Sequence, residues 1–465
     1  MESFDVAIIG AGPGGYVAAI RAAQNGLKVA LVEKDARLGG TCLNVGCIPS
    51  KALLESSEVF YVAAHEAAAH GVRLAPPELE LPTMLARKRT IVEELTAGLA
   101  LIMKRHKVTV VSGSGRLTGP GRVEVETAQG PRTLEAKHLV LATGSEPTPL
   151  ADLPFDGRRV VSSTEALSFE AVPPRLAVIG AGAVGLELGS VWRRLGAQVT
   201  VIELLPQIVP FADKQLAKAL EKSLRDLGLE FRLKTKLVGA ELRDDGVTLH
   251  LLDAKQQPEM LAADRVLVAV GRRPFAKGLG LEALGVATDE RGRVKVNGEL
   301  QTNVPGVWAI GDLVAGPMLA HKAEEEGIAV ADRIAGRPAH INYDAVPAVV
   351  YTAPELAQAG LTEDQARERG IDCQAGKFYF QSNGRAKTMG QTDGLVKVVA
   401  EAATGKLLGV HIVGPHASDL IAEAALALEL GATAQDLART CHAHPTLAEA
   451  LKEAALAVDR RSIHG

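Results

Sequence analysis

The stretch Asp5-Val-Ala-Ile-Ile-Gly-Ala-Gly-Pro-Gly-Gly15 decides how the first part of this 465-residue chain folds. Its apolar run predicts a strand, and the glycine-rich turn passes directly into a helical pattern. Gly10 permits the sharp turn, Gly12 lets a backbone approach a pyrophosphate, and Gly15 lets the helix pack on the strand. A second apolar run ends on Glu33, which is placed to accept a ribose hydroxyl. This context predicts a Rossmann-like dinucleotide-binding domain.

The same pattern recurs later in the chain, beginning with the apolar run at Leu176. A shift of 170 positions carries the three glycines and the acid of the first copy, without a gap, onto Gly180, Gly182, Gly185 and Glu203. This register predicts two duplicated folds and two cofactors, such as a flavin and a nicotinamide dinucleotide. Glu203 favours NAD, because a carboxylate accepts the 2′-hydroxyl of NAD but repels the 2′-phosphate of NADP.

Two cysteines follow the first copy, in Gly39-Gly-Thr-Cys-Leu-Asn-Val-Gly-Cys-Ile-Pro-Ser-Lys51. Cys42 and Cys47 are separated by four residues, and the tract runs into an amphipathic helix pattern with Pro49 near its first turn. A thiol at a helix N-terminus has a lowered pKa and forms the thiolate more readily. The spacing leaves two interpretations open: a redox pair, or a structural disulfide or pair of buried thiols.

The tract resembles the redox-active disulfide segment of the flavin-linked disulfide reductases, the class I pyridine nucleotide-disulfide oxidoreductases. Its ending, Cys-Ile-Pro-Ser-Lys, is most similar to the dihydrolipoamide dehydrogenase branch, and the resemblance covers essentially the entire chain. It implies FAD in the first fold, next to the cysteines, and NAD in the second. It also implies that a substrate thiol attacks Cys42 and that Cys47 is the flavin-proximal thiolate.

Further cofactor positions are implied only by the resemblance. Lys51 is similar to a lysine near flavin N5, with Glu187 as its partner, and Asp312 to an aspartate beside the ribityl or pyrophosphate region. Taken alone, the turn at Thr143 would be an ordinary turn. The remaining implied positions are Gly115, Thr143, Gly144 and Ala320 for FAD, and Val238 and Gly271 for NAD.

A histidine-rich segment, His442-Ala-His-Pro-Thr-Leu-Ala-Glu449, lies near the C-terminus. Thiol–disulfide exchange needs a group that takes a proton from a dithiol, and a histidine suits this near neutrality. Most isolated histidines are merely solvated, but the segment resembles the family's C-terminal His-Pro-Thr segment. The resemblance implies that His444 is the base and Glu449 its orienting carboxylate, with His442 a bystander. Because that base acts on the disulfide of the other subunit, it also implies a homodimer.

The pattern changes after residue 341, where alternating apolar runs and helices carry no nucleotide fingerprint. We therefore predict an α/β fold with two Rossmann-like domains and a C-terminal α+β dimerisation domain. The expected domain ranges are 1–147 for the first part of the FAD domain, 148–272 for the NAD domain, 273–341 for the second, central part of the FAD domain, and 342–465 for the interface.

The composition excludes several other classes. A net charge of −4 and a pI near 6.3 indicate no binding to nucleic acid or to an anionic membrane. No apolar run reaches about 18 residues, and four cysteines are too few for a disulfide scaffold. No metal-ligand cluster accompanies the cysteine pair, so no metal is expected. The expected location is the cytoplasm, or an organelle matrix if a presequence has been removed.

The resemblance implies a flavoprotein that oxidises protein-bound dihydrolipoamide to lipoamide with NAD. Its expected partners are a lipoyl domain and the E2 acyltransferase core of a 2-oxo acid dehydrogenase complex, in which this chain would be the E3 component. The alternatives within the class are reductases of glutathione or mercuric ion. Glutathione reductases use NADPH, against which Glu203 argues, and mercuric reductases carry further C-terminal cysteines, whereas none follows Cys441 here. The alternative from a different class is a flavin-binding dimer without enzyme activity.

Overall fold

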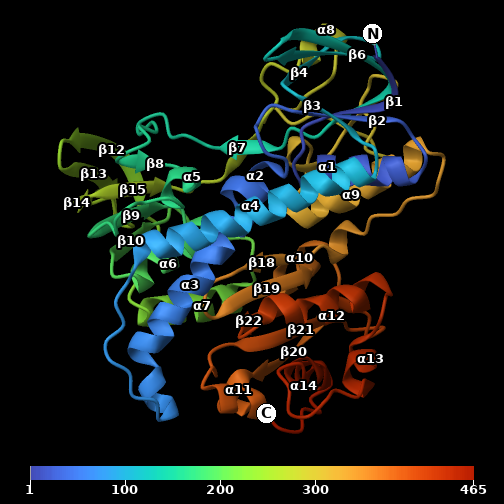
Figure 1. Cartoon of the computed structure of the whole chain (residues 1–465). Helices are drawn as coiled ribbons and strands as arrows, with labels where there is room; N and C mark the ends of the chain where they lie inside the picture. Colours follow the sequence, from blue (N-terminus) through green and yellow to red (C-terminus); the bar gives the residue numbers. More distant parts are fainter. Residues whose placement is uncertain (1) are drawn as a thin grey trace. The chain divides into compact units, whose positions relative to one another are not determined.

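The computed structural model describes residues 2–465, which fold into two compact units (Figure 1). The first unit holds the chain up to Leu53 together with Glu80–Thr148 and Gly271–Ile341. The second unit holds Leu54–Leu79, Pro149–Val270 and Asn342–Gly465. The segments expected for the NAD and interface domains thus fall largely into one unit. The division into flavin, NAD and interface domains stays a prediction.

A mixed sheet forms the centre of the first unit, with the strand order β3-β2-β1-β6-β5-β4 and with β17 also paired to β6. The parallel part of the sheet consists of β3, β2, β1, β6 and β17. The strands β5 and β4 continue the sheet beyond β6 in antiparallel pairing. Val6 lies opposite Val29 on one side and His138 on the other. The bounds are β1 Glu2–Ile9, β2 Val29–Glu33, β3 Thr109–Ser112, β4 Ser114–Gly119, β5 Arg122–Thr127, β6 Gly130–Leu141 and β17 Val307–Ala309.

Two helices of the first unit, α1 (Pro13–Gln24) and α9 (Ala320–Ile334), pack side by side (Figure 1). Their backbones meet at two glycines: a Cβ on Gly327 would lie 2.5 Å from the carbonyl oxygen of Gly14. The Arg21 guanidinium also pairs with the Asp332 carboxylate at 2.7 Å. This close crossing joins the helix of the first glycine-rich turn, α1, to α9, which lies about 300 residues later in the chain.

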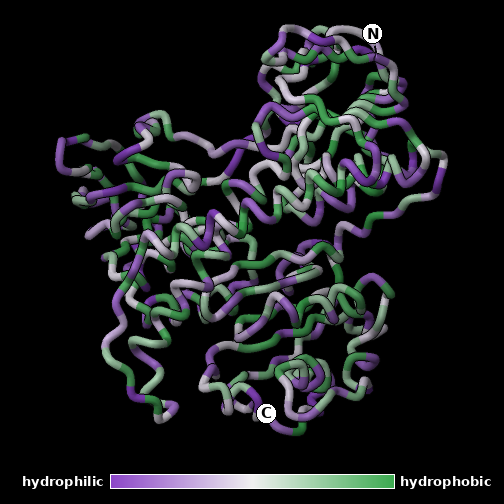
Figure 2. Tube along the Cα trace, in the orientation of Figure 1, coloured by the Kyte–Doolittle hydropathy of each residue, from purple (hydrophilic) through white to green (hydrophobic). Residues whose placement is uncertain are grey.

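The long helix α4 (Leu81–Arg105) is amphipathic, and Figure 2 shows hydrophilic and hydrophobic residues alternating along its turns. Its buried residues recur every three or four positions, which is the helical period. They are Leu81, Leu85, Lys88, Val92, Thr96, Leu99 and Met103. The first unit also contains α2 (Gly40–Val45), α8 (Leu281–Leu284), and the antiparallel pair β7 (Ser145–Pro147) and β16 (Arg272–Pro274).

The second unit contains the repeat of the dinucleotide fold. Its parallel sheet has the order β11-β10-β9-β15-β8, and an antiparallel sheet β12-β13-β14 accompanies it. The strands are β8 Val160–Val161, β9 Arg175–Ile179, β10 Gln198–Ile202, β11 Glu230–Arg232, β12 Lys236–Arg243, β13 Gly246–Leu252, β14 Pro258–Ala263 and β15 Arg265–Val268. The helices are α5 Ser163–Ala166, α6 Ala183–Arg194 and α7 Lys214–Asp226.

The C-terminal part of the second unit is an antiparallel sheet with the order β18-β19-β22-β21-β20, on which α12 and α14 pack. Its strands are β18 Ala348–Val350, β19 Glu355–Gly360, β20 Cys373–Tyr379, β21 Leu395–Glu401 and β22 Leu407–Gly414. Its helices are α10 Glu363–Glu368, α11 Gly384–Met389, α12 Ala417–Glu429, α13 Ala434–Arg439 and α14 Glu449–Val458. The predicted α/β fold with two Rossmann-like sheets and a C-terminal α+β layer is confirmed.

The crossing of α1 and α9 can be tested with the same substitution at two helical glycines. Gly327→Ala should lower the unfolding midpoint, because the new methyl group would overlap the Gly14 carbonyl; overpacking of this kind costs about 1–3 kcal/mol. Gly98→Ala in α4 should raise it, because among the described residues the methyl group meets no atom within 4 Å and alanine favours the helix by roughly 0.5–1 kcal/mol. Thermal unfolding of the two variants measures the difference. Equal midpoints would contradict the close packing.

Candidate active site

The first glycine turn has the geometry of a phosphate-binding site. Gly10 has a φ of +103°, and a Cβ there would lie 2.4 Å from the carbonyl oxygen of Ala142. A Cβ on Gly15 would lie 1.8 Å from the carbonyl oxygen of Gly10, so the helix can approach the strand only without a side chain. Gly12 is the N-cap residue of α1. A Cβ on Gly12 would have one neighbour within 4 Å among the described residues, the Cα of Gly40 at 4.0 Å. The open backbone at this helix N-terminus suits the pyrophosphate of FAD.

The second turn repeats this arrangement at the positions that the sequence register predicts. Gly180 has a φ of +102°, and a Cβ on Gly185 would lie 2.2 Å from the carbonyl oxygen of Gly180. Gly182 caps α6, and a Cβ there would have no neighbour within 4 Å in the described part of the chain. The second turn therefore suits a second pyrophosphate for the same physical reasons.

The acids at the strand ends hold these turns together, which the sequence did not predict. Glu33 is buried and accepts hydrogen bonds from the backbone amides of Ala11 and Asp35 at 2.8 and 2.9 Å. Glu203 accepts equivalent bonds from Ala181 and Leu205, both at 2.8 Å. Each carboxylate oxygen retains a second lone pair with which it could accept a ribose hydroxyl. The two acids thus have the same local role in both copies.

The cysteines lie on two consecutive helices. Cys42 belongs to α2, and Cys47 begins α3 (Cys47–His65). Gly46 separates the helices, and a Cβ on it would lie 2.8 Å from the carbonyl oxygen of Thr41. The break places Cys47 at a helix N-terminus, with Pro49 in the first turn as expected.

Neither cysteine forms a disulfide in this structure, and Cys42 is the less exposed of the two. The hydrogen bond with Cys47, followed by burial and the nearby charges of Cys47 and Glu324, raises the pKa of Cys42 well above its ordinary value. The Lys51 ammonium acts in the opposite direction. The pair can therefore keep one proton on Cys42 while Cys47, at the positive end of α3, carries the negative charge.

Side-chain hydrogen bonds connect Ser145, which follows the predicted flavin-side residues Thr143 and Gly144, to Asp312 and Arg272. Ser145 donates a hydrogen bond to Asp312 at 2.5 Å and accepts one from Arg272 Nε at 2.7 Å. Arg272 also donates to the Thr41 hydroxyl at 3.4 Å, next to Cys42. Burial lowers the pKa of Arg272, and the charges of Asp312 and Cys47 oppose this shift. The sequence analysis assigned Arg272 no role, although it directly follows the predicted site residue Gly271 and begins β16.

A buried ion pair positions the segment that carries Asp312. Lys322 and Glu326, one turn apart on α9, are almost fully buried and 2.9 Å apart. Lys322 donates to the carbonyl oxygen of Gly311 at 3.0 Å, and Glu326 accepts from the amide of the same glycine at 2.7 Å. Both backbone groups of Gly311 are thereby held, which fixes the direction of the next residue, Asp312.

The other predicted flavin-side residues lie near the ends of these strands. Gly115 is on β4, where a Cβ would lie 3.1 Å from the Val32 side chain. Thr143 donates to the carbonyl oxygen of Phe275 at 2.6 Å, and Gly144 has a φ of +70°. Ala320 is the first residue of α9.

The predicted NAD-side residues have separate surroundings. Glu187 is buried on α6 and accepts a hydrogen bond from the amide of Tyr351 at 3.0 Å. Val238 is exposed on β12, and Gly271 follows β15 with a φ of +115°. Glu187 and Lys51 belong to different units, so their predicted pairing stays a prediction.

The predicted base has its orienting carboxylate in place. His444 Nδ1 lies 2.8 Å from Glu449 Oε1, and Glu449 Oε2 accepts the amide of Thr446 at 2.9 Å. Burial raises the pKa of Glu449, but the hydrogen bonds from Thr446 and His444 outweigh it and bring the pKa below its ordinary value. A carboxylate there makes Nδ1 the donor and leaves the basic lone pair on Nε2. The imidazole is 79% exposed, so it can meet a partner.

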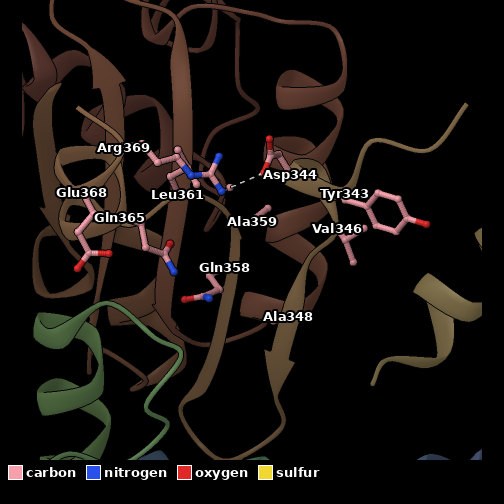
Figure 3. Close-up of a pocket in the computed structure, with 11 residues that line it drawn as sticks. Tyr343, Asp344, Val346, Ala348, Gln358, Ala359, Leu361, Gln365, Glu368 and Arg369 are labelled. Carbon is pink, nitrogen blue, oxygen red and sulfur yellow. Dashed lines mark ion pairs between the residues drawn. The ribbon is translucent and has the colours of Figure 1, made fainter. Parts of the chain in front are cut away.

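The pocket in Figure 3 lies elsewhere and has a volume of about 440 Å³. Arg369 and Asp344 face each other across it at 3.5 Å, between β18, β19 and α10. Among its described lining residues there is none of the predicted site residues. Between residues 2 and 465, no group of three or more histidine, cysteine or acidic side chains could hold a metal ion, and no helix is long and apolar enough to cross a membrane.

Comparisons with known proteins agree with this geometry. Residues 4–327 match the family model described as pyridine nucleotide-disulphide oxidoreductase, and residues 346–455 match its dimerisation domain. Dihydrolipoyl dehydrogenase 3 of Pseudomonas putida is 52% identical over 99% of both chains. The mitochondrial dihydrolipoyl dehydrogenase of Pisum sativum is 50% identical over 99% of this chain and 92% of its own.

Among solved structures, LpdA from Mycobacterium tuberculosis has a TM-score of 0.90 with 27% identity, covering 98% of this chain and 99% of its own. Both family domains and nearly the whole length are therefore matched. This chain belongs to the pyridine nucleotide-disulphide oxidoreductase family, whose FAD and NAD cofactors it uses, and within that family to the dihydrolipoyl dehydrogenases.

Proposed function

We propose that this enzyme oxidises dihydrolipoyl groups carried on a lipoyl domain and transfers the electrons to NAD through Cys42 and Cys47. The observation that carries the proposal is the placement of the two thiols: Cys42 lies on α2 in hydrogen-bond contact with Cys47, which begins α3. The proposed partner is the E2 acyltransferase core of a 2-oxo acid dehydrogenase complex. The dimerisation-domain match supports a homodimer, and the cytoplasm stays the proposed location.

The side chains divide the reaction between them. His444 Nε2 takes a proton from a substrate thiol while Glu449 holds Nδ1, and the thiolate attacks the Cys42 sulfur. In the oxidised enzyme, in which a disulfide joins the two cysteines, this attack breaks the Cys42–Cys47 bond, and Cys47 leaves as a thiolate at the N-terminus of α3. The second substrate thiol then displaces Cys42, which takes a proton because its pKa is raised. Bound FAD would accept the electron pair from the cysteines and supply it as hydride to NAD.

The cofactor positions complete the proposal. For FAD we propose the first glycine turn with Glu33 and Lys51, together with Gly115, Thr143, Gly144, Asp312 and Ala320. For NAD we propose the second glycine turn with Glu203, together with Glu187, Val238 and Gly271. The space beside the backbone at Gly12 and at Gly182, where a Cβ would meet almost no described atom, supports both assignments.

The function is tested by anaerobic titration of the FAD-loaded enzyme. Dihydrolipoamide should reduce the wild-type flavin and should fail to reduce it in Cys47→Ser, because the electron path ends at the disulfide. NADH should reduce the flavin in both proteins, which controls for folding and FAD content. Reduction of Cys47→Ser by dihydrolipoamide at the wild-type rate would refute the proposed path. A wild-type flavin that only NADH reduces would refute the substrate.

Replacing Glu449 tests the base. Glu449→Gln should lower the rate of flavin reduction by dihydrolipoamide about 10²-fold, because the amide cannot compensate charge on the His444 ring. Since its pKa is lowered, Glu449 is a carboxylate throughout the neutral range, so the loss should persist from pH 6 to 8. Stopped-flow absorbance measures it, and reduction by NADH is the control. An unchanged rate would exclude the dyad from the reaction.

The two strand-end acids form a matched pair for cofactor choice. Glu203→Gln should reduce the ratio of kcat/KM for NAD to that for NADP by at least about tenfold, because the repulsion of the 2′-phosphate is lost. Glu33→Gln makes the same local change in the first copy and should leave the ratio unchanged. Steady-state rates with each nucleotide give the ratio. If both variants, or neither, changed it, the assignment of NAD to the second copy would fall.

A further inference from the structure

The helix α14 carries two carboxylate–imidazole pairs on one face. Glu449 and Glu453 are four residues apart, so their side chains lie one above the other, with Cβ atoms about 5–6 Å apart. Glu449 Oε1 is 2.8 Å from His444 Nδ1, and Glu453 Oε1 is 2.8 Å from His464 Nδ1. The second pair thus repeats the geometry of the first, one helical turn away.

The second pair is made by the C-terminal tail, which folds back onto α14. Glu453 is nearly buried, and its Oε2 accepts the Ser462 hydroxyl at 2.7 Å, the Ile463 amide at 2.8 Å and the His464 amide at 3.3 Å. One carboxylate therefore binds three consecutive residues of the tail. This anchoring fixes where the His464 ring lies, although the ring itself is 71% exposed.

The pKa of each of the two carboxylates is lowered. Burial raises the pKa of Glu453, but hydrogen bonds from Ser462, His464 and the tail amides outweigh it and lower the pKa below its ordinary value. As a carboxylate, Glu453 makes His464 Nδ1 the donor and puts the basic lone pair on Nε2. His464 also lies close enough to Glu449 for its charge to lower the pKa of that group.

Charged groups on the elements packed against α14 face other partners. On β20 and β21, Lys377 interacts with Glu363, and Lys397 pairs with Asp213 and Glu363. On α13, Arg439 interacts with Asp436, and on α12 Glu423 holds His442. Lys452 of α14 donates to the carbonyl oxygen of Thr440, and Arg460 and Arg461 are exposed before the tail. Two carboxylates act on the His464 ring: Glu453 pairs with its Nδ1, and the Glu449 charge interacts with it.

We propose that His464 is a proton relay for the dithiol reaction and acts through His444. The inference rests on the proposed function, in which one dithiol loses two protons and one electron pair. His444 receives the first proton as the substrate thiolate attacks Cys42 and Cys47 departs. It must be deprotonated again before the second substrate thiol can displace Cys42.

His464 accepts the proton that His444 must lose before the second displacement. His444 passes the first proton, directly or through water, to His464 Nε2, which releases it to solvent. His444 then takes the second proton and delivers it to the departing Cys42 sulfur. The electron pair remains on the protein cysteines, one proton is on Cys42, and one is in solvent, so the reaction balances.

The test uses His464→Gln and, as a matched control, Ser462→Ala in the FAD-loaded enzyme. His464→Gln keeps the tail amides on Glu453 but cannot carry a proton, whereas Ser462→Ala weakens the tail anchor and keeps the imidazole. In stopped flow, His464→Gln should slow flavin reduction by dihydrolipoamide about tenfold, with an altered pH profile and recovery when imidazole is added. Ser462→Ala should lose less of the rate than His464→Gln, because the Ile463 and His464 amides still hold the tail on Glu453, and added imidazole should not change its rate. Reduction by NADH should be unchanged in both.

The outcomes separate the two inferences. A His464→Gln rate equal to wild type, or a loss that imidazole does not restore and that Ser462→Ala shares, would overturn the relay, since tail anchoring alone would then account for the effect. Failure of dihydrolipoamide to reduce the wild-type flavin would instead overturn the proposed function.

Discussion

The close approach of helix to strand at the two glycine turns is the constraint on which the site depends. A Cβ would overlap a carbonyl oxygen at Gly15 and at Gly185, so any larger residue would move the helix N-terminus off the strand. The redox segment is fixed to the first turn, because the Gly39 amide bonds to the Ala11 carbonyl at 2.8 Å and Gly40 lies against Gly12. The position of Cys42 and Cys47 therefore follows from the same backbone contact that leaves room for a dinucleotide.

The sequence predicted the parts of this site that are local or repeated. Strand, turn, helix and acid lie within about 30 residues, so their spacing is sufficient to predict the fold, and the shift of 170 positions placed the second copy correctly. The dyad of His444 and Glu449 was also accessible, because both residues lie in one short segment and the fold needs only a turn to bring them together.

Contacts between distant segments could not be predicted. Ser145 bonds to Arg272 and to Asp312, which lie 127 and 167 residues further along the chain, and a serine or arginine in a short strand carries no signal of its partner. The short helix α2 that carries Cys42 was not predicted, because it ends where Gly46 approaches the Thr41 carbonyl, a backbone contact that no sequence pattern marks. The tail on Glu453 was missed for the related reason that terminal residues have no pattern of their own.

The three C-terminal histidines differ in which of their ring nitrogens form hydrogen bonds within the chain. His442 has an acceptor on both nitrogens, the carbonyl oxygen of Thr440 at 3.0 Å and the Glu423 carboxylate at 2.9 Å. The His442 side chain is only 5% exposed and both of its nitrogens face acceptors of its own chain, so it anchors the loop and offers neither nitrogen to a substrate thiol. His444 and His464 each have a carboxylate on Nδ1 alone, which directs their basicity to Nε2. The chemistry of the segment is therefore decided by which ring nitrogens face oxygen atoms, a property that only the folded chain possesses.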